Sequence, residues 1–179
     1  MLTMEQVSDS YYYDDLKSLS TADVRSVMTA KGKSFTVSQS SLLDALDILT
    51  PLTYWVTTPA TGHAHIDISC IVTLAATLEI FEDDGNAAHF DVSAGADKTP
   101  INRNRVSTTE SGLVIATGVT VTQATADVML ITRRLGGFIG GTYTSGSDLI
   151  LAPSTEYLFM LTSDADNNEG SLILDWFEH

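Results

Sequence analysis

HAHIDISCIVTLAATLEIFE, residues 63–82, is the stretch of sequence that decides the fold. Its even positions are mostly apolar, from Ile66 to Ile80, whereas most of its odd positions are polar, from His63 to Glu79. This alternation is typical of a β-strand with one buried face. Twenty residues exceed the usual strand length of about 3 to 10. We therefore predict a bulge or tight bend within residues 73–77 that makes two strands of the stretch.

The β pattern continues toward the C-terminus. Residues 113–132 contain β-branched runs such as Val119-Thr120-Val121-Thr122, which favour strands. Three further strands are predicted at 148–151, 155–162 and 171–177, with residues 164–170 as a hairpin loop. Residues 86–111 are polar and form a long excursion, and a glycine-rich link begins at Gly136.

Two segments before residue 63 carry mixed signals. Residues 24–30 suit a helix by propensity, but the Lys31-Gly32-Lys33 turn before a β-branched run favours a strand, which is our prediction. Residues 41–50 fit either a short helix or a bulged strand, and Pro51 limits their continuation.

These elements predict an all-β fold, a jelly-roll-like antiparallel β-sandwich over residues 23–179, because eight to ten short strands are separated by turn residues. Residues 1–22 have no sustained periodicity and form the predicted extended N-terminal arm. The arm contains Tyr11, Tyr12 and Tyr13. It is either a disordered terminus or a segment that docks on a neighbouring subunit, since aromatic residues are enriched at interfaces.

Composition excludes several classes of function. With 9 basic and 23 acidic residues, the net charge is −14, which argues against nucleic acid as a partner because phosphate binding depends on cationic side chains. No apolar stretch is long enough to span a membrane, and the start lacks the pattern of a secretory signal. The single cysteine, Cys70, excludes an internal disulfide.

The acidic charge is uneven. Residues 1–98 hold 5 basic and 14 acidic side chains and residues 142–179 hold 0 and 7, whereas residues 99–141 hold 4 and 2. The four cations of the middle segment are Arg103, Arg105, Arg133 and Arg134. Arginine suits carboxylate contacts and interfaces, so we predict them as contacts with another protein subunit, with plain surface charge as the alternative.

No motif predicts catalysis, a metal or a cofactor. His63 and His65 share a strand face, but the carboxylate that a cupin metal site needs after the second histidine is missing. Residues 164–175 only imitate a calcium loop, because Glu169 stands where that loop needs glycine. Cys70 lies in the apolar register of its strand, where thiols are usually inert. A glycosidase-like pair of carboxylates formed across space stays open at this level.

Four segments in order carry a family resemblance: WVTTPATGH at 55–63, LEIFE at 78–82, NRNR at 102–105 with Ser107, and the pair LILAPSTEY at 149–157 and LILDWFE at 172–178. Together they resemble the head decoration, or cement, proteins of tailed bacteriophages. The resemblance covers roughly residues 23–179. None of these motifs is catalytic.

The resemblance implies a non-enzymatic, jelly-roll virion protein that forms a homotrimer. Such a trimer would bind the major capsid protein on the outer surface of the head and stabilise the mature capsid, after a stay in the host cytoplasm during assembly. Ligands that bind only the mature lattice stabilise it by mass action, and a trimer adds avidity. The alternative is a trimeric carbohydrate- or receptor-binding module of a phage tail or fibre, with Tyr54, Trp55 or Tyr143 as platforms for sugars.

Overall fold

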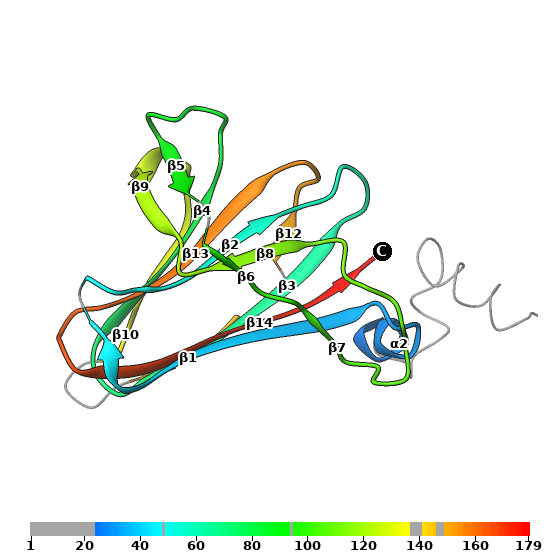
Figure 1. Cartoon of the computed structure of the whole chain (residues 1–179), viewed down its shortest axis with the longest axis horizontal. Helices are drawn as coiled ribbons and strands as arrows, with labels where there is room; N and C mark the ends of the chain where they lie inside the picture. Colours follow the sequence, from blue (N-terminus) through cyan, green and yellow to red (C-terminus); the bar gives the residue numbers. More distant parts are fainter. Residues whose placement is uncertain (1–23, 48, 94, 137–140, 146–148) are drawn as a thin grey trace, which may run out of the picture.

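A computed structural model describes residues 24–47, 49–93, 95–136, 141–145 and 149–179. The chain forms two antiparallel sheets that face each other (Figure 1). The first sheet contains, in spatial order, β11 (Gly141–Thr144), β3 (Ala64–Val72), β14 (Asn168–Glu178), β1 (Ser34–Leu46) and β7 (Ile101–Asn102), with β12 (Leu149–Leu151) also paired to β3. The second contains β10 (Met129–Leu135), β4 (Ala76–Glu82), β13 (Glu156–Ser163), β2 (Leu52–Thr57), β8 (Val114–Thr117) and β6 (Ala96–Asp97). The prediction of an all-β antiparallel sandwich is confirmed.

The order of pairing follows a simple rule. The first strand pairs with the last, β1 with β14, and the second with the last but one, β2 with β13. The third, β3, pairs with β11 and β12, and the fourth, β4, pairs with β10. The chain is thus a long double strand that wraps around one core, because successive strands from β1 to β4 alternate between the two sheets.

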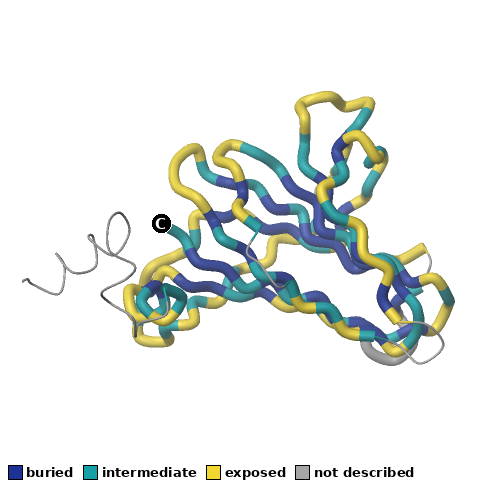
Figure 2. Tube along the Cα trace, turned by 180° about the vertical axis from the view of Figure 1, so that it is seen from behind, coloured by how far each residue is buried: buried dark blue, intermediate teal, exposed yellow. Residues whose placement is uncertain are grey.

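The core lies between the sheets and takes the apolar side of each strand (Figure 2). Along β3 the alternation from Ala64 to Val72 is buried at every even position, as the pattern predicted. The largest side chain in the core, Trp176 of β14, stacks on Phe35 of β1 with ring centroids 5.8 Å apart. Residues 73–75 separate β3 from β4, so the predicted division of residues 63–82 is confirmed.

The prediction of a strand at residues 24–30 is wrong, because Val24–Ala30 forms the helix α2. Its buried side chain is Met28, and Gly32 ends it with φ of 73°, a left-handed conformation typical of a helix C-cap. The amide of Lys33 donates to the carbonyl of Met28 across this cap. The glycine that was assigned to a strand turn therefore ends a helix, and the helix propensity of residues 24–30 was the better guide.

The ambiguous segment 41–50 is a bulged strand. It continues β1, whose register against β14 shifts between Ser41 and Leu46. A turn closed by an Asp47–Thr50 bridge then leads toward β2.

The predicted hairpin at residues 164–170 is wrong in its pairing. The flanking strands β13 and β14 belong to opposite sheets, so this loop crosses from one sheet to the other. Asn168 is fully buried at the crossing: its Oδ1 accepts from Thr73 Oγ1 (2.9 Å) and from the amide of Leu74 (2.8 Å), and its Nδ2 donates to Ser163 Oγ (3.0 Å). The loop is thereby fixed to the β3–β4 turn.

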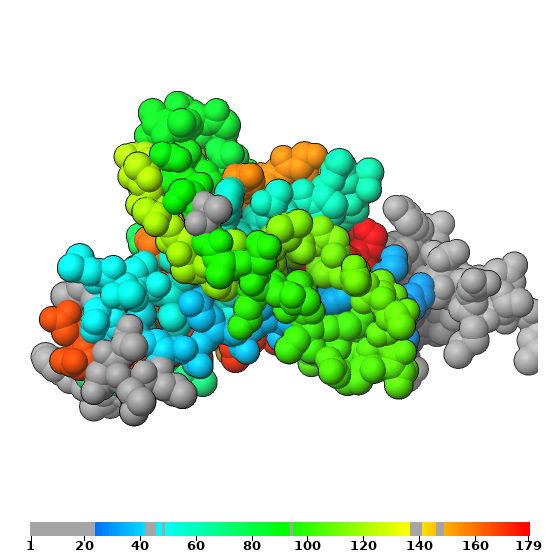
Figure 3. Space-filling view, in the orientation of Figure 1, coloured from blue at the N-terminus to red at the C-terminus, as the bar shows by residue number. Residues whose placement is uncertain are grey.

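Residues 86–111, the polar excursion, and the segment that follows them pack over part of the second sheet. β5 (Phe90–Ser93) and β9 (Thr120–Ala124) form a separate pair that projects from the body (Figure 1). Together with the short 3-10 helix η1 (Ala126–Val128), they enclose a second apolar cluster around Phe81, Phe90 and Leu158. Figure 3 shows the segment from β6 to β8 lying across one face of the molecule. No helix in the described part of the chain is long and apolar enough to cross a membrane.

Candidate functional site

The predicted contact residues divide into those outside the described structure and those within it. Tyr11, Tyr12 and Tyr13 precede Val24 and lie outside the described residues. Their docking on a neighbouring subunit stays a prediction.

The structure places the four arginines in two groups rather than one. Arg103 and Arg105 follow β7 beside α2, and Arg133 and Arg134 lie in β10, at the other end of the sandwich (Figure 1). All four are exposed. Their nearness in sequence therefore does not produce a single cationic patch.

Two of the four arginines bind carboxylates of their own chain. Arg103 lies 3.6 Å from Asp175 of β14, and Arg134 lies 2.9 Å from Asp164. Arg133 donates to the carbonyl of Thr132 at 3.3 Å. These contacts orient the side chains, which stay on the surface. Exposed ion pairs of this kind contribute little to stability.

The outer face of the first sheet shows why Arg103 has an internal partner. Asp67 of β3 and Asp175 of β14 are directly opposite in the ladder, an arrangement that destabilises a sheet when both are charged. Arg25 of α2 forms an ion pair with Asp67, and Arg103 approaches Asp175 from the other side. Sequence reasoning missed this pairing, because it depends on the register of strands more than a hundred residues apart.

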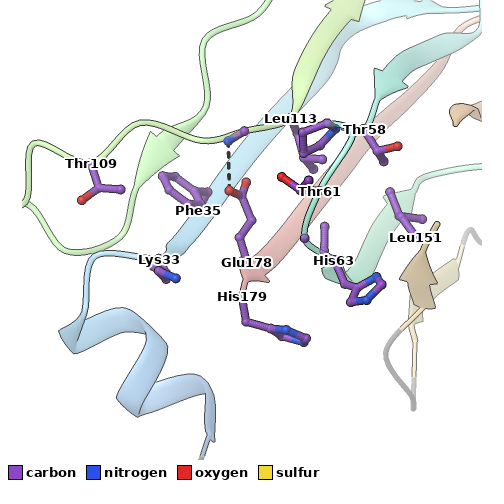
Figure 4. A pocket seen from close by; sticks show the side chains of 14 residues that line it. Lys33, Phe35, Thr58, Thr61, His63, Thr109, Leu113, Leu151, Glu178 and His179 are labelled. Carbon is purple, nitrogen blue, oxygen red and sulfur yellow. Dashed lines mark hydrogen bonds between the residues drawn. The ribbon is translucent and has the colours of Figure 1, made fainter. Parts of the chain in front are cut away.

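One end of the sandwich holds a pocket of about 320 Å³ (Figure 4). Phe35, Leu113 and Leu151 are among its apolar lining residues, and Lys33, His63 and His179 among its polar ones. The pocket combines apolar walls with nitrogen groups from the residues just before β1, just before β3 and just after β14, positions that the sequence alone does not bring together.

The carboxylate in this pocket is held by its own neighbours. Glu178 accepts from Ser111 Oγ at 2.5 Å, from the amide of Gly112 at 2.9 Å and from the indole nitrogen of Trp176 at 2.9 Å. These contacts attach the loop before β8 to the last strand. They occupy three of the about four lone-pair sites of the Glu178 carboxylate and so give it a structural role.

Three of the four histidines gather at the same end. Nε2 of His65 lies 2.8 Å from Nε2 of His179, and the ring of His63 lies 5.7 Å from that of His179. Burial lowers the pKa of His179, and the nearby positive charges of His65, His63 and Lys33 lower it further. The sequence pointed to His63 and His65 as neighbours, but His179 is 114 positions from His65.

The remaining candidate groups are engaged in the body of the fold. Cys70 is buried, and burial raises the pKa of its thiol to about 11, which is the opposite of what a nucleophilic thiolate needs. In the calcium-like segment, Asp164 pairs with Arg134 and Asn168 points inward. Within the described ranges, no three His, Cys, Asp or Glu side chains are arranged as ligands of one metal ion.

Several large apolar side chains are exposed on or beside the edge strands. Ile150 of β12 is 57% exposed, Ile71 of β3 is 54% exposed and Leu130 of β10 is 45% exposed. These strands lie along the same side of the sandwich, where β10 and β11 are in contact. The other large apolar side chains that are exposed in the described structure, Leu49, Ile101, Val106 and Val114, lie outside these strands.

Comparison with known proteins adds no family. No protein-family model matches the chain, and no curated protein is found to be similar to it.

Proposed function

We propose that this chain is a non-enzymatic virion structural protein that binds the outside of a tailed-phage head as a decoration protein. It stabilises the mature capsid lattice as a homotrimer. The observation that carries the proposal is the pairing order, in which β1 to β4 pair with β14, β13, β11/β12 and β10. This order supports a jelly roll, a fold common among viral capsid proteins and the one that the family resemblance implies.

The exposed apolar side of the sandwich supports a trimer. Ile71, Ile150 and Leu130 lie on or next to β11, β12 and β10, whose outer edges have no further strand in the described sheets. A second copy that packs there would bury these side chains and protect the open sheet edges. We assign this side, the β10–β12 side, to the contact between subunits.

The arginines support contacts with the capsid. Arg105 and Arg133 are exposed and carry the positive charge of the least acidic segment. On a chain of net charge −14, such cations are the groups best able to bind carboxylates of another protein. Arg103 and Arg134 lie next to them, and the tyrosines of the arm, residues 11–13, are the second proposed contact.

The packing of the aromatic side chains counts against the carbohydrate-binding alternative. Tyr54 is fully buried and donates its hydroxyl to the carbonyl of Leu172. Trp55 packs in the second apolar cluster and donates to Glu156, and Tyr143 packs against the main core. Burial removes Tyr54 as a sugar platform, and Trp55 and Tyr143 are half-buried by their packing.

Co-sedimentation with phage heads tests the proposal. Purified chain is mixed with expanded and with unexpanded heads of the phage that encodes it, and the bound fraction is measured at increasing protein concentration. We expect saturable binding to expanded heads only. Heads that bind no protein in either form would contradict the proposal.

Single charge reversals test the contact residues. Arg105→Glu and Arg133→Glu are expected to weaken head binding, because each replaces an exposed cation by an anion. Lys98→Glu is the matched control, since Lys98 is also exposed but lies on the excursion beside β6. Equal losses in all three variants would indicate a general charge effect and would remove the arginines from the proposed contact.

A further inference from the structure

The last strand brings three histidines to one end of the sandwich. His63 and His65 flank the first residue of β3, and His179 follows β14, which pairs with β3. The backbones of His63 and His179 exchange two hydrogen bonds of 3.3 Å beyond the ladder. The positions of the three rings are therefore set by main-chain pairing rather than by loops.

The ring geometry brings two nitrogen atoms face to face. His65 stacks on Phe177 with centroids 4.6 Å apart and planes 13° apart, which holds the plane of its ring. Its Nε2 lies 2.8 Å from Nε2 of His179, and the two centroids are 4.8 Å apart. His63 is exposed, so one side of the group is open to solvent.

We propose that His65 and His179 bind one divalent transition-metal ion of the class that prefers imidazole, with zinc as the expected member and His63 as a further ligand. Imidazole nitrogen suits zinc, nickel and copper, whereas calcium and magnesium prefer oxygen. This site goes beyond the proposed role on the capsid and does not depend on it.

An ion requires the two nitrogen atoms to separate and the two rings to tilt so that both lone pairs point at it. A tetrahedral zinc ion with Zn–N bonds of about 2.0 to 2.1 Å separates its two nitrogen ligands by about 3.3 Å. The observed 2.8 Å between the two Nε2 atoms must therefore widen by about 0.5 Å. In a neutral pair, one ring carries its hydrogen on Nε2 and donates it to the Nε2 of the other ring. To bind the ion, that ring takes the tautomer with hydrogen on Nδ1, so both Nε2 atoms offer a lone pair and the pair loses no proton.

The third ligand requires a side-chain rotation. In the described structure the three rings do not surround a common point, and no three possible ligands are arranged around one ion. The ring of His63, 5.7 Å from that of His179, turns toward the ion, and water completes the coordination from the open side.

Three charged groups of the described residues bear on this site. Glu178 is held by Ser111, Gly112 and Trp176, and Asp67 by Arg25. Lys33 lines the same pocket, and its charge works against a cation. The proposed ligands are the imidazole nitrogens, which favour zinc, nickel or copper over calcium.

Titration of the full chain with metal tests the site. The protein, made without a polyhistidine tag, is titrated at pH 7.5 with ZnCl₂ and with NiCl₂ by calorimetry, and its Tm is measured with each salt. We expect one ion per chain and a rise in Tm that saturates with metal. CaCl₂ should produce neither, because calcium binds carboxylates and not these rings.

Histidine variants locate the ion. His179→Ala and His65→Ala are expected to abolish the one-ion binding step and the rise in Tm. His89→Ala is the matched control and should keep both, because His89 pairs with Asp84 in a different part of the chain. If loss of the Phe177 stack leaves His65→Ala poorly folded, His179→Ala decides, since its side chain lies beyond the last strand.

Absence of saturable zinc and nickel binding would overturn the inference, as would binding that persists unchanged in His179→Ala. Neither result affects the head-binding measurement, because that assay is run on the same variants without added metal. Failure of the metal site and failure of the decoration role are therefore separate outcomes.

Discussion

Asn168 is the residue whose role differs most from what its sequence context suggests. In the sequence it belongs to a polar run that resembles a calcium loop, yet in the fold it is 0% exposed. Its amide group connects residues of the β3–β4 turn with Ser163 of β13. A buried amide with all of these partners specifies how the chain crosses between the sheets.

Replacement of Asn168 by alanine is expected to lower the free energy of unfolding by about 2 to 3 kcal/mol, because the amide of Leu74 and the hydroxyl of Thr73 lose their partner. Chemical denaturation measures the change. Asp166→Ala, an exposed position of the same loop, is the control and should stay within about 0.5 kcal/mol of the parent. A loss of similar size in both variants would contradict a specific role for Asn168.

His89 provides a second test at the residue scale. Its Nδ1 lies 2.7 Å from a carboxylate oxygen of Asp84, and this hydrogen bond raises the pKa of His89 above 6.5 and lowers the pKa of Asp84 below 3.8. The contribution of His89 to stability is complete below its unfolded pKa and is lost as pH rises through the raised pKa. That of Asp84 is complete above its unfolded pKa and is lost as pH falls through the lowered one.

An NMR titration of the His89 ring is therefore expected to show a midpoint above 6.5 that moves down in Asp84→Asn. The same titration in Asp91→Asn serves as a control, because it removes an exposed carboxylate close to His89 in sequence and leaves the pair with Asp84 in place. A midpoint that does not respond to Asp84→Asn would show that the pair does not form in solution.

At the scale of elements, α2 shows how a short helix depends on what it packs against. Seven residues are too few for a stable isolated helix. Met28 is buried, Arg25 pairs with Asp67, and α2 packs on β1 and β14. Tertiary contacts therefore stabilise a helix that is too short to form alone, although its sequence suits a helix by propensity.

Met28→Ala is expected to lower the free energy of unfolding by about 2 kcal/mol or more, since Met28 is the buried side chain of α2. Urea denaturation measures the total change, and hydrogen exchange reports whether the amides of residues 27–33 lose protection first. Ser26→Ala, on an exposed position of the same helix, is the control and should change stability far less. Unchanged stability in Met28→Ala would contradict the docking of α2.

At the scale of the whole molecule, assembly is the next question. The β10–β12 side, proposed above as the subunit contact, exposes Ile150 and Ile71. Light scattering at several concentrations is expected to find three times the chain mass of 19.2 kDa. Ile150→Glu should reduce it to one chain, because a buried unpaired charge destabilises an interface.

Leu49→Glu is the matched control for this experiment. Leu49 is 91% exposed in the turn between β1 and β2, away from the β10–β12 side, so the trimer should persist. A single-chain mass for the parent protein at all concentrations would restrict the proposal to trimers that form only on the capsid.

The sequence by itself determined the properties that depend on neighbouring residues. Period-two alternation identified the strands on both sides of residues 73–75, because the two faces of a strand are a local property. The mixed pattern of residues 41–50 included a bulged strand among its two interpretations, and β1 has that bulge. Only the tertiary structure decided which strands meet. Strand register brought Asp175 opposite Asp67, Asn168 under the β3–β4 turn and His179 to His65, and it separated Arg103 from Arg133. Such contacts join residues about a hundred positions apart, and burial across two sheets, rather than local propensity, selects them.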